Sequence, residues 1–104
     1  NARLMARSKG EYDQWTALGR EIQQKLEQAV TAQTDPAGAE GQTLALLHRR
    51  WCSFQWAGAG DPKAHAALAA LYTADSRFTA YYDRTIPGCA AFLRAAVEAC
   101  AGIR

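Results

Sequence analysis

The chain has 104 residues, of which 49% are hydrophobic and 21% charged, and its formal net charge at pH 7 is +2. This composition indicates a folded globular domain and excludes intrinsic disorder, which requires low hydrophobicity and high net charge. The basic residues are scattered along the chain, which argues against a nucleic-acid surface. The chain also lacks an apolar run of the roughly 18 residues that a membrane span needs, so we expect no membrane partner.

A capping-box spacing, Ser8 to Glu11, predicts that a first helix begins near Ser8 or Lys9. Apolar residues then recur at steps of three and four and predict one buried stripe. The stripe consists of Tyr12, Trp15, Leu18, Ile22, Leu26, Ala29 and Val30. A proline and two glycines within residues 35–41 predict a connector after this helix.

A second helix follows the connector and ends before Gly58 and Gly60. Its predicted apolar face carries Leu44, Leu47, His48, Trp51 and Phe54. We expect the neighbouring pair Arg49-Arg50 to lie on a solvated face. A third helix is predicted to begin at Asp61-Pro62, an N-cap acceptor followed by proline at the first helical position.

Asp75 is predicted to cap a short fourth helix, and Pro87-Gly88 precedes a last helix with an apolar stripe. No segment alternates with the period of two that a strand shows. We therefore predict an all-α, compact five-helix domain that spans residues 1–104. The three cysteines are odd in number and form no C-x-x-C pair, which predicts free thiols and favours a cytoplasmic location.

The segment around the third and fourth helices carries a distinctive order of residues: Leu71-Tyr72, Asp75, Arg77-Phe78-Thr79, and then Pro87-Gly88 before an amphipathic helix. This order resembles the signature of the TipAS domain, the all-helical antibiotic-recognition module usually found behind a MerR-type DNA-binding domain. The resemblance covers roughly residues 8–102. It implies a globin-like arrangement of helices around a deep cleft that takes up bulky, largely apolar antibiotics.

The resemblance also implies that the chain is a fragment of a regulator, which agrees with its start at Asn1 instead of Met. Residues 1–7 are then the remnant of a mobile N-terminal segment or of a preceding linker. DNA would be contacted only through an upstream domain, and a homodimer of the full-length regulator stays an open possibility. Ala67 stands where some family members have the cysteine that captures thiopeptides covalently, so we expect no covalent capture at that position.

The predicted function is non-catalytic recognition of an antibiotic, either as the effector-sensing part of a transcriptional regulator or to sequester the drug. No nucleophile with its base and no converging pair of carboxylates can be recognised, so we predict no enzyme and no cofactor. The predicted ligand-binding residues are Trp15, Trp51, Phe54, Gln55, His65, Tyr72, Tyr81 and Tyr82.

Other interpretations of these residues stay open. The aromatic residues could simply form the core, and we expect that Tyr81 and Tyr82, as neighbours on one helix, cannot both point inward. His65 could be a core histidine. A helical protein-interaction or dimerisation module would use the same aromatic residues as a docking surface. A thiol or metal sensor would use His48, Cys52 and His65, although this spacing more often reflects packing, and we expect no metal.

Overall fold

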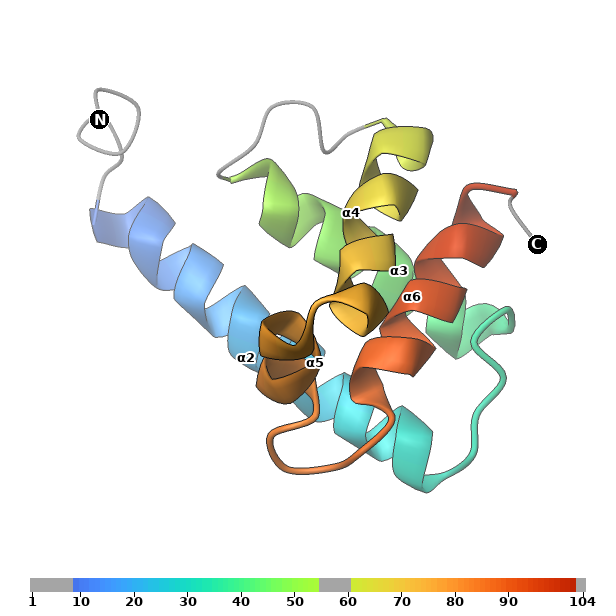
Figure 1. The fold of residues 1–104 in the computed structure, drawn as a ribbon. Coiled ribbons are helices and arrows are strands. Elements are labelled where there is room, and N and C mark those ends of the chain that lie inside the picture. The colour runs from blue at the N-terminus through green and yellow to red at the C-terminus, as the bar shows by residue number, and fades with distance from the viewer. Residues whose placement is uncertain (1–8, 55–60, 103–104) are drawn as a thin grey trace.

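The computed structural model describes residues 9–54 and 61–102, which form five α-helices (Figure 1). They are α2 (Lys9–Thr31), α3 (Ala39–Ser53), α4 (Pro62–Ala74), α5 (Ser76–Tyr82) and α6 (Cys89–Cys100). No strand occurs within the described ranges. The predicted all-α, five-helix fold is confirmed. None of the helices in this part of the chain is both long enough and apolar enough to cross a membrane.

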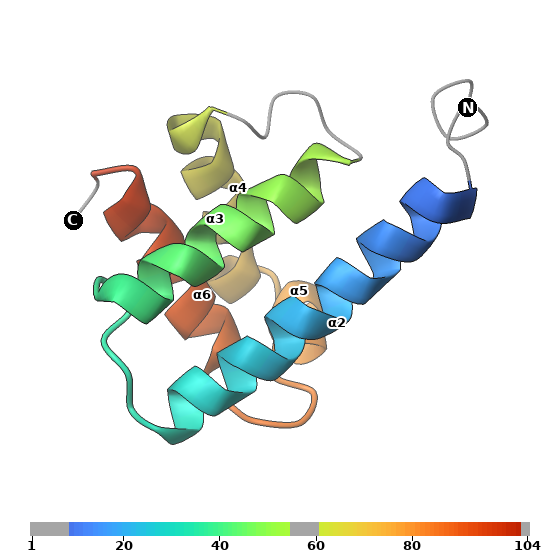
Figure 2. The same ribbon diagram turned by 180° about the vertical axis from the view of Figure 1, so that it is seen from behind.

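Helix α6 lies at the centre of the fold and contacts each of the other four helices (Figures 1 and 2). Its predicted stripe is buried except at its end: Cys89, Leu93, Ala96 and Val97 are each at most 1% exposed, whereas Cys100 is only partly buried. Small alanine side chains allow neighbouring helix backbones to approach closely.

Helix α2 runs along one side of the molecule, and its N-terminal half extends beyond the group formed by α3, α4 and α6 (Figure 2). Its C-terminal half buries Ile22, Leu26 and Ala29 in the core. The predicted stripe is wrong at Tyr12, which is 59% exposed, because the first turns of the helix lie beyond the packed body. The capping role predicted for Ser8 lies outside the described residues.

The predicted helix starts at the two aspartates are confirmed. The side chain of Asp61 accepts a hydrogen bond from the backbone N–H of Lys63, and that of Asp75 accepts one from the backbone N–H of Arg77. Asp75 also ends α4, so a single residue turns the chain from α4 into α5. This turn brings the aromatic residues of α5 next to those of α4.

Two interactions differ from the sequence prediction or could not be read from it. Arg49 is half-buried instead of solvated, and its Nη2 donates a hydrogen bond to Cys100 Sγ at 3.2 Å. The buried amide of Gln23 on α2 donates to the backbone carbonyl of Tyr82, 59 residues away, at 2.9 Å. This second bond fixes the middle of α2 against the end of α5.

Candidate functional site

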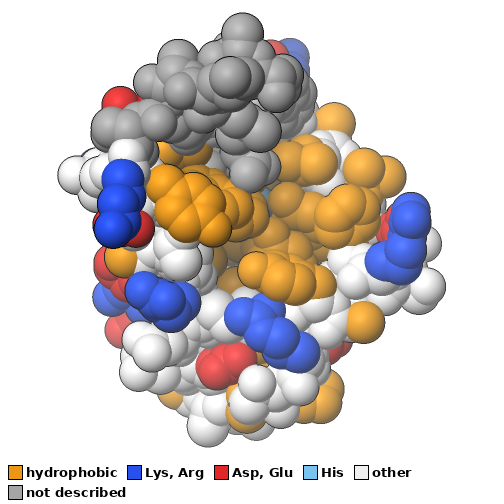
Figure 3. All heavy atoms as spheres, turned by 90° about the vertical axis from the view of Figure 1, so that its left-hand side faces the viewer, with side chains coloured by type: hydrophobic (Ala, Val, Ile, Leu, Met, Phe, Trp, Pro, Cys, Tyr) orange, Lys and Arg blue, Asp and Glu red, His pale blue; other side chains and the backbone are white. Residues whose placement is uncertain are grey.

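A cleft of about 780 Å³ opens between α2, α3, α4 and α5. Its volume lies within the range of roughly 300–1,000 Å³ that is typical of small-molecule sites. Hydrophobic side chains gather around a hollow on this face of the molecule, with Lys and Arg side chains around it (Figure 3). The cleft is lined by Trp15, Trp51, Cys52, Leu68, Tyr72, Arg77, Phe78, Tyr81 and Tyr82.

Two tryptophans form one wall of the cleft. The rings of Trp15 on α2 and Trp51 on α3 stack with centroids 5.3 Å apart and planes 7° from parallel. The Nε1 atom of Trp15 is buried and has no hydrogen-bond partner among the described residues. A flat apolar ligand would therefore meet a large, rigid aromatic surface.

Tyrosines and Phe78 supply much of the remaining lining. Tyr72 and Tyr82 are 3% and 5% exposed, with ring centroids 4.7 Å apart, whereas Tyr81 is 49% exposed and Phe78 is 37% exposed. The two neighbours Tyr81 and Tyr82 both line the cleft, and of the two only Tyr82 is buried, as expected of neighbours on one helix. Tyr82 is buried and Tyr81 lies at the rim, and their rings meet edge to face with centroids 5.0 Å apart.

A chain of buried polar groups continues from the cleft into the core. His48 Nε2 lies 3.0 Å from Tyr82 Oη, and His48 Nδ1 lies 2.7 Å from His65 Nε2. The two histidines are 1% and 0% exposed. Burial, and then the charge of the partner His65, lowers the pKa of His48 to about 3; burial, and then Arg49, lowers the pKa of His65 to about 4. Both imidazoles are therefore neutral at physiological pH.

Cys52 lines the cleft and lies beside this chain, with its Sγ 3.7 Å from His48 Nδ1. Burial raises the pKa of the Cys52 thiol to about 11. A protonated thiol beside a histidine whose pKa is depressed is a weak nucleophile, since the thiolate is the reactive form. This Cys–His pair therefore does not form an activated catalytic pair.

The structure places the predicted site residues in three different environments. Trp15, Trp51, Tyr72, Tyr81 and Tyr82 line the cleft together. His65 lies beneath it, fully buried against His48. Phe54 is half-buried near the end of α3 and is not among the lining residues, and Gln55 lies outside the described residues.

Cys52, Leu68, Arg77 and Phe78 also line the cleft, although none was among the predicted ligand-binding residues. Helical spacing could have identified two of them. Leu68 lies four residues before Tyr72, and Phe78 lies four residues before Tyr82, so each pair shares a helix face. Arg77, which carries the charge in the lining, had no such signal.

The fold and the cleft together define a helical small-molecule recognition domain: a rigid, largely aromatic cavity on an alanine-packed core. The chain belongs to the TipAS antibiotic-recognition domain family, whose model matches residues 1–100. The resemblance found in the sequence is thus confirmed. Neither a curated protein nor a solved structure gives a significant match.

Proposed function

We propose that this domain takes a bulky, largely apolar antibiotic, rich in amides or heterocycles, into the aromatic cleft between α2 and α5. The observation that carries the proposal is the cleft of about 780 Å³ whose lining combines the stacked Trp15 and Trp51 with three tyrosines. Aromatic side chains give a large contact area for bulky apolar ligands at low cost in conformational entropy.

The lining favours a neutral or weakly anionic ligand. Its apolar surface comes from aromatic rings and Leu68, and its charged side chain, Arg77, is already paired with Asp75 at 2.9 Å. Ligand amides would find donors and acceptors in the tyrosine hydroxyl groups of the lining. We propose no catalytic step, because the two histidines beside the cleft are neutral and the Cys52 thiol is protonated.

We further propose that binding is read by a DNA-binding domain elsewhere in a longer, cytoplasmic polypeptide, or that the domain sequesters the drug. A ligand that binds one conformation better than another shifts the population toward it. Helix α2 is suited to report such a shift, because it supplies Trp15 to the cleft while its first turns project from the body (Figure 2).

The proposal is tested by titrating the protein with thiopeptides and other bulky natural products while tryptophan fluorescence and thermal melting are recorded. Saturable quenching together with a raised melting temperature for one chemical class is the expected result. Tyr81→Ala should weaken binding of that class by about tenfold or more, since an aromatic anchor is worth over 1 kcal/mol. It should melt close to wild type, because Tyr81 is half exposed.

Tyr12→Ala is the matched control, because Tyr12 is an exposed tyrosine outside the cleft lining. It should bind like wild type. If no compound binds and the melting temperature rises with protein concentration, the aromatic face is instead an interaction or dimerisation surface. Equal losses of affinity in the Tyr81 and Tyr12 variants would contradict the assignment of the ligand to the cleft.

A further inference from the structure

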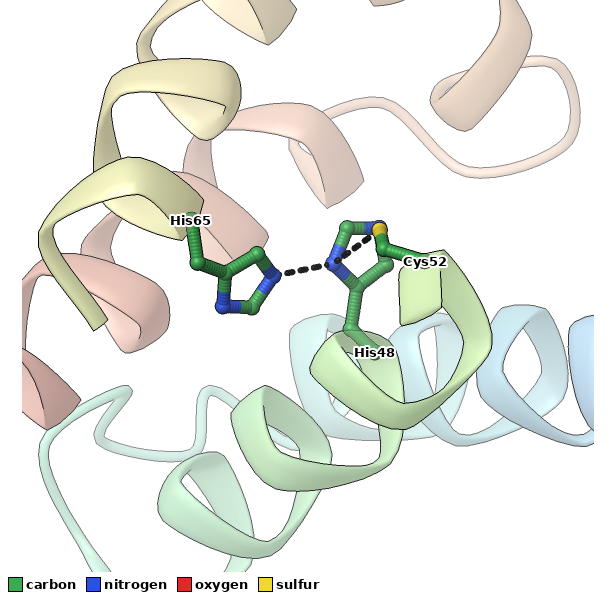
Figure 4. A group of neighbouring side chains, drawn as sticks. All are labelled: His48, Cys52 and His65. Carbon is green, nitrogen blue, oxygen red and sulfur yellow. Dashed lines mark hydrogen bonds between the residues drawn. The ribbon is translucent and has the colours of Figure 1, made fainter. Parts of the chain in front are cut away.

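Three side chains with metal-ligand chemistry point toward one another from two helices (Figure 4). His48 and Cys52 lie four residues apart on one face of α3, and His65 reaches them from α4. One ligand atom of each lies within 4.8 Å of the others, and all three residues are buried.

We propose that His48, Cys52 and His65 form a buried binding site for a single Zn²⁺ or Cu⁺ ion, separate from the antibiotic cleft but reached through it. Imidazole nitrogen and thiolate sulfur are the preferred ligands of zinc, and soft thiolate also favours Cu⁺. Hard cations such as Mg²⁺ and Ca²⁺ would find no carboxylate or carbonyl oxygen in this ligand set.

Two of the three distances between the ligand atoms are close to those that an ion needs, and all three lie within 4.8 Å. Two nitrogen ligands at a tetrahedral zinc lie about 3.3 Å apart, and a nitrogen and a sulfur about 3.5 Å apart. His48 Nδ1 is 2.7 Å from His65 Nε2 and 3.7 Å from Cys52 Sγ. An ion would therefore take the place of the hydrogen atom that now joins the two imidazoles. The two nitrogens would move roughly 0.6 Å further apart, and the Cys52 side chain would rotate.

The protons balance in this exchange. Each imidazole keeps one proton, on the nitrogen that faces away from the ion: Nε2 of His48 and Nδ1 of His65. Cys52 gives up its thiol proton and binds as the thiolate, so one proton leaves for each ion bound. His48 Nε2 would then donate to Tyr82 Oη at 3.0 Å, the kind of outer hydrogen bond that orients a metal-ligating histidine.

The cleft supplies the entry path. Cys52 is one of its lining residues, whereas His48 and His65 are almost fully buried behind it. Three protein ligands leave a fourth position on the ion, which a water molecule or a ligand atom could fill from the side of Cys52. The ion would therefore sit where the cleft and the core meet.

The test is a titration of the reduced, metal-free protein with Co²⁺ as a spectroscopic substitute for zinc, followed by displacement with Zn²⁺. Binding of one ion should produce a thiolate-to-cobalt charge-transfer band and the visible bands of tetrahedral cobalt. Cys52→Ala should abolish the charge-transfer band, and His65→Gln should lower zinc affinity by at least about 100-fold. A parallel titration with Cu⁺ against a coloured chelator distinguishes copper from zinc.

Cys100→Ala is the matched control, because it removes a partly exposed thiol on α6 that is not in this cluster. Its cobalt spectrum should match that of wild type. Thermal melting with and without Zn²⁺ gives a second measurement: the ion should raise the melting temperature of wild type and Cys100→Ala but not of Cys52→Ala. The proposal is overturned if folded wild type binds none of the three ions in a one-to-one ratio, or if Cys52→Ala keeps the charge-transfer band.

Discussion

His48 on α3 and His65 on α4 face each other in the core, with Nδ1 of the first 2.7 Å from Nε2 of the second. One of these nitrogens donates and the other accepts, so the pair holds two neutral imidazoles in a defined orientation. The pair joins the aromatic cleft to the protein interior, because His48 also contacts the hydroxyl group of Tyr82. The stability of the domain should therefore depend on the protonation of these two residues.

We predict that the metal-free protein loses stability as the pH falls from 6.5 to 4.5. The pKa values of His48 and His65 are lowered from 6.5 to about 3 and about 4, so the unfolded chain binds more protons than the folded one across this interval. Each histidine should reduce the free energy of unfolding by about 2 kcal/mol over this range. Urea unfolding at several pH values, with a chelator present, measures the slope.

His65→Gln is the variant that checks this assignment. It removes one of the two titrating imidazoles, so its pH dependence should be about half that of wild type, whatever its stability at pH 7. An unchanged slope would show that other groups cause the pH dependence.

We predict that Gly41→Ala strongly destabilises the fold. A methyl group at Gly41 would overlap the backbone carbonyl group of Pro36, and a backbone cannot yield as a side chain does. In a helix, alanine is normally about 1 kcal/mol more favourable than glycine. We expect instead a loss of over about 2 kcal/mol in the free energy of unfolding, since overpacking costs 1–3 kcal/mol and the helix-propensity gain offsets only part of a severe clash. Chemical unfolding measures it, and a stability at or above wild type would contradict the close approach.

Gly19→Ala should act on the cleft instead of on global stability. The new methyl group would lie 2.8 Å from Nε1 of Trp51, whose side chain can shift. The gain in helix propensity should offset most of the steric cost, leaving the free energy of unfolding within about 1 kcal/mol of wild type. The Trp15–Trp51 stack should open, with an altered tryptophan emission spectrum and weaker binding of any cleft ligand. An emission spectrum identical to that of wild type would contradict this contact.

Gln23→Ala should loosen the join between α2 and α5. The amide of Gln23 donates to the buried carbonyl of Tyr82 at 2.9 Å, so its removal leaves that acceptor unpaired. A lost buried hydrogen bond of this kind costs about 1–3 kcal/mol. The adjacent Gln24 is exposed and serves as the control, with an expected change near zero on substitution by alanine. Equal effects of the two substitutions in urea unfolding would contradict a specific role for Gln23.

Signals within a few residues of one another predicted the helices and their family. The periodic apolar residues of α6, the caps at Asp61 and Asp75, and the order of motifs around α4 and α5 are all local. Each cap joins an aspartate side chain to the backbone N–H two residues later. It can therefore be predicted without any knowledge of how the helices pack. The same signals pointed to the TipAS family, and the family's model matches residues 1–100 of the chain.

Helical periodicity gives the face of a side chain but not the depth at which it lies. Tyr12 and Trp15 belong to one predicted stripe, yet Tyr12 is exposed and Trp15 stacks on Trp51, because α2 projects beyond the helices that cover its other half. The same limit applies to Tyr81 and Tyr82, which share the cleft at different depths.

The sequence by itself therefore determined an all-α domain of the TipAS type with an excess of aromatic residues, because those properties depend on local periodicity, caps and motif order. Only the tertiary structure decided that five of the predicted residues form a cleft and that His65 pairs with His48 beneath it. The physical reason is that these residues lie on four different helices, and the distances between them depend on how each helix packs around α6.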